Sequence, residues 1–231
     1  MRGSLIEVKK EFHYSTAGDG VEYSFRFEFQ SFIGRRLFYN RPQKKNGYCN
    51  LGCGNRFIYD YVNADFFQFN FLRKLLKKPI LDQKLDWELD IRHPIKCSDN
   101  FFSGILLEHV LEHLKINDAI KTLSELRRIL IPNGILRISV PDLEKYINFY
   151  LKKKTHKKFL NWSKIPSEAL WSLNHNFGHQ NAFDFMLISD VLKRAGFSKI
   201  RKCTFNGSED SMLKIDDIGR SWESLYVEAT K

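Results

Sequence analysis

A short glycine turn follows the first compact apolar run of the sequence. Residues 48–51 form that run, and Gly52-Cys53-Gly54 comes directly after it. Closely spaced glycines allow a backbone to approach a ligand and to adopt left-handed conformations. In open α/β folds, such a turn lies at the carboxyl edge of the sheet, where ligands bind. The turn is therefore a candidate binding site, although turns after buried strands also contain glycine for purely structural reasons.

Acidic residues follow the next two predicted strands. Asp65 and Asp90 each come directly after an apolar run. A carboxylate at the end of the second strand can accept two hydrogen bonds from ribose hydroxyls, and one at the third strand can accept from an adenine amino group. The third glycine of a diphosphate-binding turn is absent, because Asn55 follows Gly54. The pattern favours a nucleoside over a dinucleotide, while either acid alone could be a helix cap or a loop carboxylate.

These residues need a sheet to bring them together, and the sequence predicts one. From Gly47 onward, short apolar runs alternate with helical periods, which is typical of a parallel sheet with crossover helices. The predicted strands are residues 48–51, 61–64, 87–89, 104–107, 135–140, 198–203 and 225–229.

Two helices are clearly indicated between these strands. The first spans residues 118–130, where Asn117 or Asp118 can cap the first turn and the turn at 132–134 can end the helix. The second spans residues 188–194 and is followed by glycine in the usual C-terminal position.

Two parts of the chain lie outside this alternation. Residues 1–46 form an N-terminal extension without recognisable chemistry, in which the segment 21–29 fits either a half-buried strand or one face of a helix. Residues 47–231 are predicted to form one α/β domain. Near 146–181 lies an insertion rich in Lys, Trp, Asn and His. We expect this insertion to be a cap on the substrate side, because long connections inside a compact domain are usually functional or partly disordered.

Taken in order, these motifs resemble the class I S-adenosylmethionine-dependent methyltransferases, particularly the type 11 branch. The resemblance covers roughly residues 47–231. The segments that carry it are residues 50–55 (first motif), 62–65 (second strand and ribose-binding acid), 89–94 (adenine-binding turn), 104–113 (fourth strand and following helix), 130–142 (fifth strand), 178–184 with 195–197 (before the sixth strand) and 224–229 (last strand).

The resemblance implies a fold, a cofactor and a set of binding residues. The fold is a doubly wound, Rossmann-like α/β fold with a seven-stranded, mostly parallel sheet and an antiparallel last strand. The cofactor is S-adenosyl-L-methionine. The interval between the glycine turn and the ribose-binding acid is short, so the first crossover helix should be abbreviated. The cofactor-binding residues implied by the resemblance are Asn50, Gly52, Cys53, Gly54, Asp65, Asp90, Ile91 and Glu108.

Methyl transfer places modest demands on catalytic residues. The sulfonium is already a strong electrophile, so holding the acceptor in line with the methyl group can supply much of the catalysis. A base is needed only for a weak acceptor such as a hydroxyl. His109, after the fourth predicted strand, and His179, in the insertion, are the candidate catalytic residues. For His109 the alternative is a structural histidine at a helix start, and His175 or Asp142 could supply the acceptor contact instead.

No metal site is predicted from the sequence. The four cysteines lack a CxxC pair and a histidine partner at ligand spacing, so neither a disulfide framework nor a zinc site is indicated. Glu112 and His113, one turn beyond His109, are interpreted as structural helix residues. The cysteines are Cys49, Cys53, Cys97 and Cys203.

The formal charge of +10 and the pI near 9.4 would suit an anionic partner such as nucleic acid or a phosphorylated substrate. The densest basic run, Lys152-Lys153-Lys154 with Lys157-Lys158, can equally be a solvated surface. The resemblance favours a small-molecule or glycan-type acceptor. The alternatives are an RNA or other nucleic-acid methyltransferase and a non-catalytic cofactor-binding module. Familiar amino-adenine and cytosine-carbon chemistry is disfavoured, because residues 108–111 lack an Asn/Asp-Pro-Pro-aromatic run and the chain has no Pro-Cys pair.

No apolar run approaches the roughly 20 residues needed to cross a bilayer. The first four residues are followed by charge rather than by the apolar core of a signal peptide. We therefore expect a cytoplasmic protein without a transmembrane segment. The sequence leaves the oligomeric state open.

Overall fold

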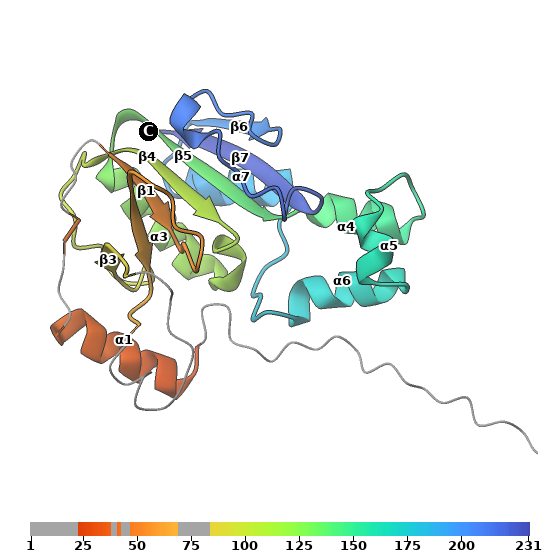
Figure 1. The fold of residues 1–231 in the computed structure, drawn as a ribbon, viewed down its shortest axis with the longest axis horizontal. Coiled ribbons are helices and arrows are strands. Elements are labelled where there is room, and N and C mark those ends of the chain that lie inside the picture. Colours follow the sequence, from red (N-terminus) through yellow and green to blue (C-terminus); the bar gives the residue numbers. More distant parts are fainter. Residues whose placement is uncertain (1–22, 38–40, 43–46, 69–83) are drawn as a thin grey trace, which may run out of the picture.

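The computed structural model describes residues 23–37, 41–42, 47–68 and 84–231. The predicted N-terminal extension is thus described only in part, and residues 21–22 of its ambiguous segment lie outside the described residues. The described chain folds around one sheet with the strand order β3-β2-β1-β4-β5-β7-β6 (Figure 1). The strands are β1 (Tyr48–Leu51), β2 (Tyr61–Asp65), β3 (Trp87–Glu88), β4 (Phe102–Glu108), β5 (Leu130–Pro141), β6 (Lys199–Cys203) and β7 (Ser224–Thr230).

Strand directions match the predicted fold. Strands β1 to β5 pair in parallel, and β7 pairs antiparallel with both β5 and β6. The prediction of a doubly wound, mostly parallel sheet with an antiparallel last strand is confirmed. The order reverses at β1 and β4, which is the position where open α/β sheets bind ligands beyond the carboxyl ends of their strands.

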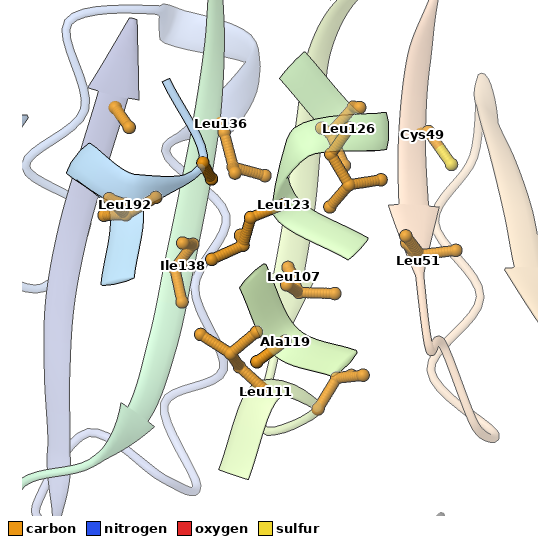
Figure 2. Close-up of a cluster of buried hydrophobic side chains, with 14 of the residues drawn as sticks. Cys49, Leu51, Leu107, Leu111, Ala119, Leu123, Leu126, Leu136, Ile138 and Leu192 are labelled. Atoms are coloured by element: carbon orange, nitrogen blue, oxygen red, sulfur yellow. The ribbon is translucent and has the colours of Figure 1, made fainter. Parts of the chain in front are cut away.

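Helices α3 (Ile116–Ile129) and α7 (Phe185–Arg194) supply much of the core. Leu123 and Leu126 of α3 and Leu192 of α7 are fully buried. They lie against β5, where Leu136 and Ile138 point toward them (Figure 2). Burying each such side chain stabilises the fold by about 1.5–3 kcal/mol. This packing holds β4 and β5 in place and so positions the residues at their carboxyl ends.

The start of α3 differs from the prediction. The helix begins at Ile116 with Lys115 as its N-cap residue, and no side chain caps it. The predicted cap at Asn117 or Asp118 is wrong, because both residues already lie in the first helical turn. The Asp118 carboxylate instead accepts a hydrogen bond of 2.9 Å from the hydroxyl of Tyr23.

Helix α7 starts three residues before its predicted position. Asp184 acts as the N-cap, and its side chain accepts a hydrogen bond from the backbone N–H of Leu187. The helix ends beside Gly196, whose φ of 96° lies in the left-handed region that glycine adopts freely.

The connection between β1 and β2 contains no helix, so the predicted abbreviated crossover helix is wrong. Residues 52–60 form turns and irregular structure. Asn63 holds this loop, since its Oδ1 accepts from Ile58 N at 2.8 Å and from Asn50 Nδ2 at 3.2 Å. Asn50 Nδ2 also donates to the Arg56 carbonyl at 2.7 Å. These side-chain bonds replace the backbone bonds that a helix would supply.

The ambiguous N-terminal segment contains the start of helix α1 (Phe25–Leu37), so its interpretation as a helix is the correct one. Ser31 is buried, and its hydroxyl donates to Asp90 Oδ2 at 2.5 Å. Gly34 lies so close to Phe67 that a Cβ atom would be 2.3 Å from the ring. The helix therefore packs against the segments that follow β2 and β3.

Helices α4 (Leu143–Tyr150), α5 (Lys158–Trp162) and α6 (Pro166–His175) gather beside the end of β5 (Figure 1). They contain a small hydrophobic cluster of their own, separate from the main core, made of Tyr146, Phe149, Phe159, Ala169 and Leu173. None of the helices in the described ranges is both long enough and apolar enough to cross a bilayer.

Candidate active site

The carboxyl ends of β1, β2, β3 and β4 meet along one edge of the sheet. Leu51 pairs with Ala64 of β2 and with Leu107 of β4, so the residues that follow these strands are neighbours. The structure thus brings the predicted cofactor residues to one edge. They are Asn50, Gly52, Cys53, Gly54, Asp65, Asp90, Ile91 and Glu108.

The two glycines of the turn have different roles. Both adopt left-handed backbone angles, with φ of 72° at Gly52 and 51° at Gly54. A Cβ atom at Gly52 would lie 2.2 Å from a methyl carbon of Val110, whereas one at Gly54 would meet nothing within 4 Å. The backbone N–H groups of Gly52 and Cys53 both donate to the Ala64 carbonyl, at 2.8 and 3.1 Å. Gly52 is therefore required by packing, and Gly54 leaves open space beside the backbone.

Asp65 is half-buried at the end of β2. Its Oδ2 accepts from Gly54 N at 2.7 Å, and its Oδ1 accepts from Phe66 N at 2.6 Å. Burial raises the pKa of Asp65, although both backbone hydrogen bonds act in the opposite direction. Each oxygen has one donor, so the carboxylate keeps the capacity to accept further hydrogen bonds.

Asp90, by contrast, is surrounded by donors. Its carboxylate accepts from Ser31 Oγ, from the Arg92 backbone N–H at 3.0 Å, and from Arg92 Nε and Nη2 at 3.0 and 2.7 Å. Burial would raise the pKa of Asp90, but the bonds from Arg92 and Ser31 lower it below the usual range. The neighbouring Ile91 offers its carbonyl to Thr122 Oγ1 at 2.8 Å. In this structure, Asp90 joins the end of β3 to α1, and its contact with adenine stays a prediction.

Glu108 links β4 to two other segments. It forms an ion pair with Arg56, which follows the glycine turn, and its Oε1 accepts from Asp217 N at 2.9 Å. Arg56 also donates to the Ile215 carbonyl. Burial raises the pKa of Glu108. Sequence reasoning missed Arg56 and the segment before β7, because their partners are distant in the chain.

His109 lies between β7 and a buried carboxylate. Its φ of 51° is unusual for a residue other than glycine. Its Nε2 lies 2.7 Å from the hydroxyl of Ser224, and its Nδ1 lies 3.2 Å from Oε1 of Glu112. The Ser224 hydroxyl donates to the Arg220 carbonyl at 2.8 Å, so His109 Nε2 is the donor in the His109–Ser224 contact. Both ring nitrogens therefore face groups of the protein.

Glu112 and His113 belong to a buried group that the sequence did not reveal. They lie on the short 3-10 turn η1 (Leu111–His113), and one ligand atom from each lies within 4.8 Å of a ring nitrogen of His179. We call Glu112, His113 and His179 the Glu112 cluster. Burial would raise the pKa of Glu112, but His109, His113 and His179 together lower it to about 2. Glu112 therefore carries a full negative charge in the interior.

The other two candidate residues lie elsewhere. His175 is exposed at the end of α6, with its ring 5.2 Å from that of Trp171. Asp142 is buried and caps α4 by accepting from the backbone N–H of Glu144. Burial raises the pKa of Asp142. Neither side chain is part of the Glu112 cluster.

A cavity of about 230 Å³ lies between α4, α5 and α6 and the loop before β7. Its wall includes Pro141 at the end of β5 and Glu223 next to Ser224. Three of its aromatic lining residues are Tyr146, Trp162 and Trp222, and its polar lining residues include His179, Arg220 and Glu223. Of the two predicted catalytic residues, His179 lines this cavity, and His109 reaches its margin through Ser224.

Residues 49–138 match the family model described as a methyltransferase domain, of the type 11 family. This match agrees with the predicted resemblance to the type 11 methyltransferases over that segment of the chain. No curated protein matches the sequence.

Several solved structures are similar to this chain. A methyltransferase from Archaeoglobus fulgidus, described as SAM dependent, has 15% identity and a TM-score of 0.47, with 89% of this chain and 94% of that chain covered. PigF with SAH has 14% identity and a TM-score of 0.47, covering 81% and 51%. A protein from Nostoc punctiforme has 10% identity and a TM-score of 0.45, covering 88% and 55%. This chain thus spans about half the length of the last two chains.

The edge of the sheet fits S-adenosylmethionine in two respects. The backbone at Gly54 borders open space, as a ligand that approaches the turn requires. The Asp65 carboxylate keeps acceptor capacity for ribose hydroxyls.

Proposed function

We propose that this protein is an S-adenosylmethionine-dependent methyltransferase that transfers the methyl group to a small-molecule or glycan-type acceptor bound in the cavity beside β5 and β7. The main support for the proposal is the position of the cavity. It is bordered by Pro141, at the carboxyl end of β5, and by Glu223, directly before the start of β7. Glu223 is followed by Ser224, the residue that contacts His109 at the end of β4. An acceptor there would lie next to the edge that we assign to the cofactor.

The size and lining of the cavity support a compact acceptor. Its volume of about 230 Å³ is below the ~300–1,000 Å³ of pockets for drug-sized ligands. Tyr146, Trp162 and Trp222 offer apolar ring surface, while Arg220 and Glu223 offer charged groups that can orient polar substituents. A small ring-shaped acceptor with several hydroxyls matches this combination.

We assign each site residue a part in binding or orientation. When bound, S-adenosylmethionine supplies an electrophilic methyl group on sulfur. Gly52, Cys53 and Gly54 let the backbone approach it, Asp65 accepts from its ribose, and Asp90 and Ile91 border its adenine. Asn50 and Glu108 support this edge through the loop contacts described above. His109 and His179 orient the acceptor, and one of them removes its proton where the acceptor is a hydroxyl.

The domain organisation supports the same arrangement. We assign residues 47–231 to the methyltransferase domain and residues 1–46 to an extension. Residues near 146–181 then form the cap over the acceptor. In support, α4, α5 and α6 supply Tyr146, Trp162 and Leu173 to the wall of the cavity.

Calorimetry and product analysis test the proposal. S-adenosylmethionine and its demethylated product should bind in the micromolar range, about −8 kcal/mol. A panel of hydroxylated small molecules and glycans should yield a methylated product by mass spectrometry. Trp222→Ala should raise KM for that acceptor at least about tenfold, because ring surface is lost from the cavity. Tyr150→Ala, a half-exposed residue of α4 outside the cavity lining, is the control.

Other outcomes would contradict the proposal. Tight binding of a nicotinamide dinucleotide without binding of S-adenosylmethionine would overturn the cofactor site. Cofactor binding without product from any acceptor would favour a non-catalytic binding module. An unchanged KM in Trp222→Ala would place the acceptor outside the cavity.

The basic surface of the cap favours nucleic acid as a second candidate acceptor. All five lysines of the run 152–158 are exposed between α4 and the first turn of α5. Lysines on a surface can neutralise phosphates, and a small pocket can accept an extruded base. Binding to mixed RNA and DNA should then weaken steeply as salt is raised. A shallow salt dependence, with methylation of small acceptors alone, would exclude this candidate.

A further inference from the structure

We propose that the Glu112 cluster is a binding site for a divalent transition-metal ion, with Zn²⁺ as the ion to test. Its members come from two distant segments. Glu112 and His113 lie on η1 directly after β4, and His179 lies in the loop between α6 and α7. Their ligand atoms already lie within 4.8 Å of one another.

The first argument is that the cluster contains buried polar atoms without hydrogen-bond partners. Glu112 is 1% exposed and His113 is 7% exposed. Within the described chain, neither carboxylate oxygen of Glu112 nor Nδ1 of His113 has a hydrogen-bond partner. Nδ1 of His109 lies 3.2 Å from Oε1 of Glu112, within ion-pair distance but outside hydrogen-bond geometry. Arg220 is engaged by Glu223 at 2.9 Å. Buried polar atoms are normally paired, and an ion is one explanation for those that are not.

The second argument is that His179 is oriented by a hydrogen bond of the kind that metal-binding histidines make. Nδ1 of His179 lies 2.8 Å from the Leu173 carbonyl. A carbonyl only accepts, so this nitrogen carries the proton and Nε2 carries a lone pair. Metal-binding histidines commonly donate their other N–H to a carbonyl.

The third argument is the chemistry of the donor set. One carboxylate and two imidazoles are the protein ligands of many catalytic zinc sites, and such sites leave a position open. Ligand atoms in a tetrahedral zinc site lie about 3.3 Å apart, given bonds of ~2.0–2.1 Å. The present separation of up to 4.8 Å requires a contraction that small side-chain rotations can supply.

The fourth argument is the strained backbone beside the cluster. Phe177 has φ of 60° and the following Gly178 has φ of 73°, so two consecutive residues before His179 are left-handed. His109, three residues before Glu112, has φ of 51°. Left-handed conformations at residues other than glycine are costly and tend to occur at functional sites.

An ion at this cluster would border the acceptor cavity. His179, Leu173 and Phe177 all line the cavity, so the open coordination position would face it. There the ion could hold a water molecule or a hydroxyl oxygen of the acceptor and favour loss of its proton. This consequence rests on the proposed function, whereas binding of the ion does not. His109 then acts as a positioning residue, because its Nδ1 lies 3.2 Å from Oε1 of Glu112.

Metal titration of the full chain tests the proposal without acceptor or cofactor. The protein is first dialysed against a chelator and then titrated with Zn²⁺ in a calorimeter. We expect one tight site, and a rise in the thermal unfolding midpoint on adding Zn²⁺. Co²⁺ should produce the visible absorption of a low-coordinate cobalt ion. Glu112→Gln, His113→Ala and His179→Ala should each weaken Zn²⁺ binding by at least about 100-fold, and His109→Ala by about 10–100-fold.

Matched variants separate a metal site from a structural cluster. His156→Ala, which changes an exposed histidine outside the cluster, should bind Zn²⁺ as the wild type does. Glu112→Gln keeps the shape of the side chain, so circular dichroism can establish that it folds before its affinity is measured. Absence of a tight site in folded wild type overturns the proposal. So does unchanged affinity in Glu112→Gln and His179→Ala. Because no acceptor is present, either result leaves methyl transfer to be judged separately.

Discussion

This protein has two groups of buried charged side chains, and they differ in how completely their atoms are hydrogen-bonded. In the first, Arg137 of β5 is fully buried and meets Asp216 and Glu228, and we call these residues the Arg137 cluster. Arg137 Nε donates to Asp216 at 2.6 Å, Nη1 donates to Glu228 at 3.1 Å, and Nη2 donates to the Thr204 carbonyl at 3.0 Å. In the second, the Glu112 cluster, three side-chain atoms have no hydrogen-bond partner among the described residues.

The comparison separates a structural use of charge from a functional one. A buried ion pair that satisfies every donor and acceptor can be tolerated and can hold segments in register. The Arg137 cluster does this by joining β5 and β7 to the segment between β6 and β7. Atoms without partners cost free energy unless something binds them. We therefore expect changes in the Arg137 cluster to affect folding, and changes near the Glu112 cluster to affect binding and turnover.

The largest expected effect is on folding, from Arg137→Ala. Removing the guanidinium leaves two buried carboxylates without their main partner, which should lower the free energy of unfolding by about 3–5 kcal/mol. Urea denaturation measures this loss. Arg201→Ala is the control, because that side chain is 38% exposed and pairs with Glu228 from the surface. Arg201→Ala should lower the free energy of unfolding by no more than about 1 kcal/mol. Equal losses in both variants would contradict the structural role assigned to the Arg137 cluster.

The next effect is on turnover, from His109→Asn. Asparagine tolerates the left-handed backbone at this position, so the variant should fold normally. If His109 is the general base, the rate should fall by about 10²–10⁴-fold and a titration should disappear from the pH profile. If it only positions the acceptor, the loss should occur without that change in profile. Rates of both proteins against pH, with the acceptor saturating, distinguish the roles. Unchanged turnover at every pH would make His109 structural.

A smaller effect on cofactor affinity is expected from Asp65→Ala. The Asp65 carboxylate is only partly hydrogen-bonded, since each oxygen accepts from one backbone N–H and can accept one more hydrogen bond. Losing hydrogen bonds to its charged carboxylate should weaken S-adenosylmethionine binding by about 1.5–3 kcal/mol. Calorimetry provides the measurement, and Asp190→Ala on the exposed side of α7 serves as the control. Wild-type affinity in Asp65→Ala would assign the ribose contact to another residue.

The smallest effect concerns Asp90 and depends on pH. Its carboxylate is as fully bonded as those of the Arg137 cluster, so it should contribute to stability. Asp90→Asn should lower the free energy of unfolding by about 1–2 kcal/mol at pH 7, as charged hydrogen bonds become neutral ones. Because the folded-state pKa of Asp90 is lowered, its contribution is complete above the unfolded pKa near ~3.9 and is lost as pH falls through the folded value. The difference in unfolding free energy between the wild type and Asp90→Asn should therefore be smaller at pH 3 than at pH 7. A difference that grows on acidification would contradict the assigned ion pair.

The accuracy of the sequence predictions varied with the distance between interacting residues. Strand β1 has the predicted bounds, and the predicted strand at 61–64 extends by one residue to Asp65. These elements depend on apolar patterns within a few positions. The predicted crossover helix after Gly54 failed, because Asn63 and Asn50 bind the loop across two strands. The helix α1 was ambiguous for the same reason, since its burial depends on contacts with Phe67 and Asp90.

The sequence by itself determined the succession of strands along the chain, the glycine turn and the acids that follow β2 and β3. Each of these rests on local backbone preferences and on the alternation of short apolar segments. Only the tertiary structure decided which charges are paired. Glu112 meets His179, and Arg137 meets Asp216, across long stretches of chain. Such partners become neighbours when the sheet closes and α4, α5 and α6 dock beside it. Hydrogen bonding of a buried charge is set by that geometry, and no local pattern encodes it.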